Sequence, residues 1–72
     1  MTGWERSLHG VTAYALAQLT AVQREDYEHD RTVYLRAGFQ AADACEAAYA
    51  GVTGDRSTVD RLRAAYVSHA RL

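Results

Sequence analysis

The chain has 72 residues and a formal net charge of −1, and a folded chain of this length buries only about 60% of its unfolded surface. A core this small gains little stability without a disulfide, a metal or a partner subunit. The single cysteine, Cys45, excludes an internal disulfide and a structural zinc site, and the near-zero charge argues against a general nucleic-acid binder.

The first predicted helix covers residues 3 to 26. "TGWE" has the form of a capping box, with Thr2 at the N-cap and a glutamate three residues on. Apolar residues then recur at three- and four-residue steps: Trp4, Leu8, Val11, Ala15, Leu19 and Val22. Gly10 allows an alternative in which a short helix ends at His9 and Thr12 caps a second one. We favour one continuous or kinked helix, because a single interior glycine costs only about 1 kcal/mol.

The second predicted helix covers residues 31 to 50 and ends at "AGVTGD", with Gly51 as the C-terminal cap. Its apolar stripe contains Tyr34, Leu35, Gly38, Phe39, Ala42, Cys45 and Tyr49. Cys45 lies on this stripe, so we expect it to be buried as a small apolar filler. Small side chains also recur along the helix, at Ala37, Ala41, Ala44 and Ala48. Such a row lets another helix approach closely, within the chain or across a dimer.

The third predicted helix covers residues 57 to 71, with "STVD" as a capping box that starts at Ser57. The sequence therefore predicts an all-α fold in a single domain of residues 1 to 72: a small three-helix bundle, or a helical hairpin with an extra arm. An alternative joins the first two helices into one rod of about 70 Å. A homodimer would compensate for the small core, and Trp4, in phase with Leu8, is expected to pack in the core or at the dimer interface.

Few features of the sequence support a catalytic site or a metal site. The Glu-x-x-His motif of di-iron bundles is absent, because the residues three before His9, His29 and His69 are arginine, aspartate and tyrosine. We expect no metal and no cofactor. Nucleophilic catalysis needs a histidine and an orienting group beside the nucleophile, and we expect so short a chain to lack a pocket of a few hundred Å³. The prediction is that the protein is not an enzyme.

DNA binding by the last helix is an alternative, since four arginines occur in it or directly before it: Arg56, Arg61, Arg63 and Arg71. The connection over residues 51 to 56 is longer than the turn of a helix-turn-helix motif. Asp55 and Asp60 lie among the arginines and would repel phosphate. Direct nucleic-acid binding is therefore disfavoured.

The stretch "QREDYEHDR" holds four of the nine acidic residues. One interpretation is a solvated corner between helices, with Asp26 or Asp30 as the N-cap of the second helix. The other is an acidic and aromatic patch that faces a basic protein surface, since carboxylates steer the encounter and tyrosines add contact area. That patch would contain Glu25, Asp26, Tyr27, Glu28, Asp30 and Tyr34.

The predicted function is therefore non-enzymatic: the protein binds and regulates or inhibits a macromolecular partner through the acidic and aromatic surface. Phage-encoded inhibitors of bacterial defence complexes share this size and mild acidity, so an inhibitor of a nucleic-acid-binding complex is one version. The alternatives are a self-assembling structural subunit and a DNA-binding regulator. No run of residues is long and apolar enough to span a membrane, and no signal peptide is recognised, so we expect a cytoplasmic protein.

Overall fold

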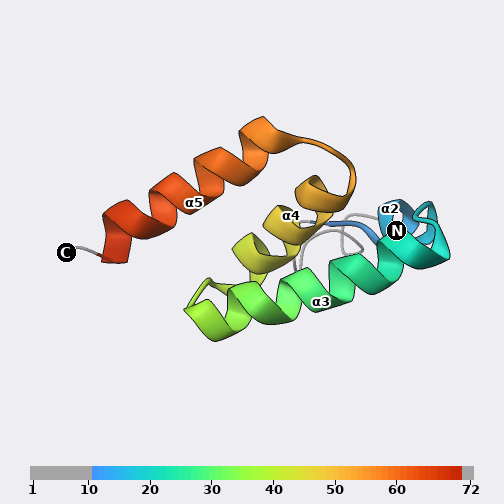
Figure 1. The fold of residues 1–72 in the computed structure, drawn as a ribbon, viewed down its shortest axis with the longest axis horizontal. Coiled ribbons are helices and arrows are strands. Elements are labelled where there is room, and N and C mark those ends of the chain that lie inside the picture. Colours follow the sequence, from blue (N-terminus) through green and yellow to red (C-terminus); the bar gives the residue numbers. More distant parts are fainter. Residues whose placement is uncertain (1–10, 71–72) are drawn as a thin grey trace.

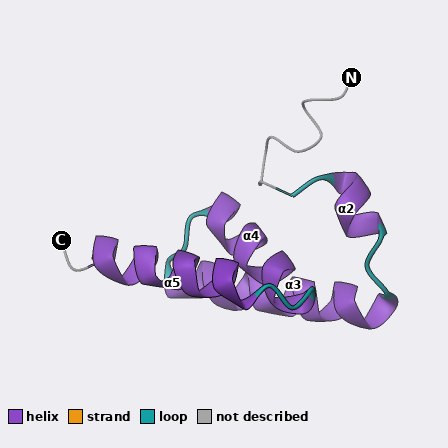
Figure 2. Cartoon of the chain, turned by 90° about the horizontal axis from the view of Figure 1, so that it is seen from above, coloured by secondary structure: helices purple, strands orange, loops and turns teal. Residues whose placement is uncertain are grey.

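The computed structural model describes residues 11–70, which form four helices (Figure 1). They are α2 (Ala13–Ala17), α3 (Ala21–Ala37), α4 (Ala41–Val52) and α5 (Arg56–Ala70). α4 turns back across α3, and α5 packs on α4 and extends away from this hairpin (Figures 1 and 2). The predicted all-α class is confirmed, and the described part resembles a helical hairpin with an arm. Trp4 lies outside the described residues.

The continuous or kinked helix predicted for residues 3 to 26 is wrong, because the chain breaks between α2 and α3. Thr20 starts α3: its hydroxyl accepts from the Gln23 amide at 3.1 Å, and the Gln23 side chain accepts from the Thr20 amide at 2.9 Å. This capping box satisfies two amide groups that a helix start leaves open. The cap at Thr12, named only as an alternative, is present, since its hydroxyl accepts from the Ala15 amide at 2.9 Å.

The second break falls at Gly38, which sequence reasoning placed inside a helix. Gly38 has φ 109°, in the left-handed region that favours glycine. Its amide donates to the Leu35 carbonyl, and the Phe39 amide donates to the Tyr34 carbonyl, both at 3.0 Å. These bonds end α3. Gly51 instead lies inside α4, so both the predicted helix of residues 31 to 50 and the longer rod are wrong.

The start of α5 is set by Asp55, not by the predicted cap Ser57. The Asp55 carboxylate accepts from the Thr58 hydroxyl at 2.7 Å, from the Thr58 amide at 3.2 Å and from the Ser57 hydroxyl at 3.1 Å. These hydrogen bonds, the one from the Thr58 side chain first, lower the pKa of Asp55. An ionised carboxylate at a helix N-terminus also interacts favourably with the helix dipole.

Alanines make up much of the core, and they lie on α4. Ala44, Ala47 and Ala48 have no exposed surface, and Cys45 is 4% exposed, so the predicted burial of Cys45 is confirmed. Small side chains here let α3 and α5 pack against α4. Two members of the predicted alanine row, Ala44 and Ala48, do pack between helices. Ala37 and Ala41 are exposed, because the break at Gly38 places them at the ends of different helices.

Candidate functional site

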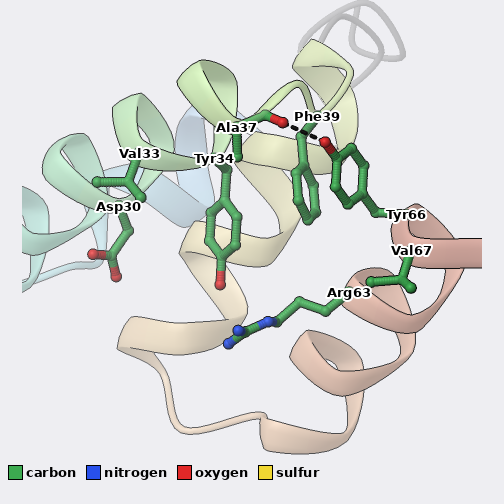
Figure 3. Close-up of a pocket in the computed structure, with 8 residues that line it drawn as sticks. All are labelled: Asp30, Val33, Tyr34, Ala37, Phe39, Arg63, Tyr66 and Val67. Carbon is green, nitrogen blue, oxygen red and sulfur yellow. Dashed lines mark hydrogen bonds between the residues drawn. The ribbon is translucent and has the colours of Figure 1, made fainter. Parts of the chain in front are cut away.

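A pocket of about 430 Å³ opens between α3 and α5, beside the corner at Gly38 (Figure 3). We call it the α3–α5 groove. Its lining comes from both helices and from the loop before α4: Asp30, Val33, Tyr34, Ala37, Phe39, Arg63, Tyr66 and Val67. The expectation that so short a chain has no pocket of a few hundred Å³ is therefore wrong.

Three aromatic rings form one end of the groove. Phe39 stacks on Tyr66 with ring centroids 4.4 Å apart and an interplanar angle of 17°, and Tyr34 meets Phe39 at 4.7 Å and 52°. The Tyr66 hydroxyl donates to the Ala37 carbonyl at the end of α3 (Figure 3). These contacts hold α5 to the α3–α4 corner, so the aromatic surface has a defined position.

Gly38 permits this arrangement in a second way. A Cβ atom at this position would lie 2.9 Å from the Tyr66 hydroxyl oxygen, closer than two such atoms can approach without a shift. The glycine therefore allows both the left-handed end of α3 and the close approach of Tyr66.

Apolar side chains on the two walls are open to solvent. Val33 on α3 is 49% exposed and Val67 on α5 is 51% exposed. Half-exposed valines on both sides of an aromatic surface leave apolar area without a partner within the described residues. This is the feature of the groove that a ligand or a partner would cover.

The walls carry opposite charges. Asp30 lies on the α3 wall and Arg63 on the α5 wall, with the Tyr34 hydroxyl and the Arg63 guanidinium pointing toward the same side of the groove (Figure 3). Neither Asp30 nor Arg63 forms an ion pair with another described residue; the pairs that occur are Arg31 with Glu28 and Arg61 with Glu46. The groove therefore offers one anion and one cation for orienting whatever binds there.

The predicted acidic and aromatic patch is only partly present. Tyr27 is 4% exposed and packs with Cys45 and Ala48 in the core. Burial raises the pKa of its hydroxyl, and the neighbouring Cys45 thiol adds to the rise. Tyr27 therefore cannot belong to a surface patch. The physical reason is its position in the middle of α3, where the side facing α4 is buried.

The predicted interhelical corner is also wrong, because residues 23 to 31 lie inside α3 and neither Asp26 nor Asp30 caps a helix. Glu25, Asp26 and Glu28 are exposed. Glu28 forms an exposed pair with Arg31 at 3.1 Å. Asp26 precedes Asp30 by four residues, so both carboxylates lie on the side of α3 that carries the groove.

Sequence reasoning missed the groove because its residues belong to different predicted stripes. Phe39 was placed on the apolar stripe of the second predicted helix, Tyr66 falls in the third predicted helix, and Arg63 was considered only for DNA binding. One local signal was available: Phe39 follows Gly38, and an apolar residue often follows a glycine cap to pack near the helix end. No spacing in the sequence indicates that Tyr66 stacks on Phe39.

Residues 11–70 contain no cluster of three or more histidine, cysteine, aspartate or glutamate side chains that could hold a metal ion. Over the same range, no helix has the length and apolar character needed to cross a membrane. Comparison with protein-family models, curated proteins and solved structures found no match to the chain. The groove and the charges beside it are therefore the features of the described chain that bear on function.

Proposed function

We propose that the protein is a non-enzymatic binding protein that regulates or inhibits a protein partner through the α3–α5 groove. The observation that carries this proposal is the pair of half-exposed valines, Val33 and Val67, beside the Tyr34, Phe39 and Tyr66 rings. Aromatic residues in a defined position, with apolar neighbours and charges at the edge, are typical of the residues that dominate binding energy at protein interfaces.

The polar groups of the groove support binding over catalysis. They are Asp30, Tyr34, Arg63 and Tyr66, and the Tyr66 hydroxyl is already bonded to the Ala37 carbonyl. Among the described side chains that line the groove, none is a histidine, serine or cysteine, so these side chains do not assemble a nucleophile with an adjacent base. Opposite charges at the two walls can instead orient a bound partner.

The acidic side of α3 supports a partner with a basic surface. Asp26 and Asp30 lie one turn apart beside the groove, and Glu25 is exposed on the same helix. The proposal thus keeps the acidic and aromatic character inferred from the sequence, with Phe39 and Tyr66 in place of Tyr27. DNA binding is less well supported, because Arg61 pairs with Glu46 at 3.6 Å and acidic residues flank the groove.

Self-assembly is a second candidate, favoured by the core. Besides alanines, the buried apolar residues of the described chain are few: Tyr27, Phe39, Cys45, Val59 and Leu62. A second copy could add apolar contacts that so small a core lacks. The proposed homodimer and the structural-subunit alternative both depend on this point.

Affinity capture from the native host tests the proposed function when it compares matched variants. Val67→Asp places a charge in the groove, and Val22→Asp places the same charge at a valine on α3 that is 68% exposed and outside the groove. We expect one protein to be recovered with the wild type and with Val22→Asp, and to be lost with Val67→Asp. Equal recovery with all three proteins would remove the groove as the binding surface.

A further inference from the structure

We propose that the occupant of the α3–α5 groove is a single amphipathic helix of another protein. Its apolar face would cover Val33, Val67 and the aromatic rings, with a basic residue on the edge beside α3 and an acidic residue on the edge beside α5. This inference rests on the proposed function, because it names the partner element that the groove takes.

The backbone of the groove favours a helix over an extended segment. α3 and α5 bond their own amide and carbonyl groups internally, and the Ala37 carbonyl at the end of α3 accepts the Tyr66 hydroxyl. A strand has no sheet edge here to pair with. An extended segment would press its own backbone polar groups against aromatic rings, and a buried polar group without a hydrogen-bond partner is unfavourable. A helix arrives with these groups already bonded.

Charge complementarity sets the orientation of the occupant. The α3 wall carries Asp30, with Asp26 one turn before it, and the α5 wall carries Arg63. A helix with a lysine or arginine toward α3 and a glutamate or aspartate toward α5 pairs with both walls. The reversed helix would place like charges together at both walls, which disfavours it.

The described surface does not supply such a helix from a second copy. A helix that fills a groove presents about three apolar side chains at i, i+3 or i+4, and i+7. The large apolar side chains exposed on residues 11–70 are Tyr14, Val22, Val33, Leu35 and Val67. α5 contributes only Val67 to this set, and Asp26 and His29 interrupt the side of α3 between Val22 and Val33. Residues 11–70 of a second copy therefore fit the groove less well than an amphipathic helix of a different protein does.

Selection from a displayed library of helices tests the inference with the full chain as the target. Each helix would be about 18 residues long, because shorter isolated helices are marginal in water, with one face and both edges randomised. We expect enriched members to share an apolar row at helical spacing, a basic residue on one edge and an acidic residue on the other. Asp30→Lys should reverse the preferred charge on the first edge, and Arg63→Glu should reverse it on the second.

The best helix should lose about tenfold or more in affinity for Val67→Asp, as expected for the loss of a central apolar contact. Affinity for Val22→Asp should change by less than about twofold. Val33→Asp gives an independent test of the other wall, and circular dichroism of each variant checks that it folds.

Three results would overturn the inference. The first is enrichment of helices whose apolar residues lack helical spacing, and the second is enrichment on the wild type no greater than on Val67→Asp. The third is a dimer in light scattering that Val67→Asp dissociates, which would assign the groove to a second copy. Failure here leaves the proposed function standing if Val67→Asp still abolishes capture of a host protein. Capture that does not depend on Val67 would remove both.

Discussion

Replacing Gly38 by alanine should destabilise the fold more than the same change at Gly54. Both glycines have positive φ, 109° and 84°, and a non-glycine residue in left-handed backbone costs roughly 1–2 kcal/mol. The surroundings differ. A Cβ at Gly54 meets no atom within 4 Å, whereas a Cβ at Gly38 lies 2.9 Å from the Tyr66 hydroxyl oxygen.

The extra loss at Gly38 comes from the contact with Tyr66. The added Cβ must displace the Tyr66 hydroxyl from the Ala37 carbonyl, and a hydrogen bond of this kind contributes about 0.5–1.5 kcal/mol. We therefore expect Gly54→Ala to lower the free energy of unfolding by roughly 1–2 kcal/mol and Gly38→Ala by roughly 1.5–3.5 kcal/mol. For a domain of this size, 2 kcal/mol lowers the melting temperature by roughly 8–16 °C.

A double-mutant cycle with Tyr66→Phe isolates this contact. Phenylalanine lacks the hydroxyl, and the nearest remaining ring atoms lie 3.6 and 3.7 Å from the added Cβ, which is ordinary contact. In this background Gly38→Ala should cost about as much as Gly54→Ala. Urea unfolding followed by circular dichroism gives all the free energies. Equal losses for Gly38→Ala with and without the hydroxyl would refute the reasoning.

Three further predictions concern the core and the start of α5. Ala48→Leu should lower the free energy of unfolding by about 1–3 kcal/mol in urea melts, because Ala48 is fully buried. Ala42→Leu, at an exposed position, should change it little. Similar losses for the two variants would contradict an alanine core. The pKa of Asp55 is below its ordinary value of 3.8, so the wild type should be more stable than Asp55→Asn above that pH. This difference in stability should disappear as the pH falls through the lower pKa of Asp55 in the folded protein. Asp60→Asn, at an exposed position, serves as the control. Cys45 is 4% exposed, so its thiol should react with an aromatic disulfide reagent far more slowly in buffer than in denaturant. Equal rates would show that the thiol is open to solvent.

Patterns among neighbouring residues correctly predicted the features that depend on helical spacing. The all-α class, the burial of Cys45 and the packing of Ala44 and Ala48 follow from apolar residues at helical spacing. The predicted helix bounds were wrong, although the residues that start and end a helix also lie close together in the sequence. "TAVQ" at Thr20 is a capping box, and its weight was missed because the apolar stripe continues through it with Val22.

The prediction of an acidic and aromatic patch on α3 was partly wrong for a different reason. Residues 23 to 31 form one helical segment, so its side chains point in every direction around the axis, and only packing decides which of them are buried. α4 covers the side with Tyr27 and leaves Glu25 and Glu28 in solvent. Spacing alone cannot choose that side when tyrosines occur among carboxylates, because either face could turn inward.

The sequence by itself determined that residues 11–70 are mainly helical and which residues are able to cap a helix, since a capping hydrogen bond joins groups only a few residues apart. The tertiary structure alone decided that Phe39 stacks on Tyr66, and that Asp30 and Arg63 lie on opposite walls of one groove. These pairings depend on how closely the helices pack against the alanines of α4. That packing is a property of the whole chain, and the groove that carries the proposed function is its consequence.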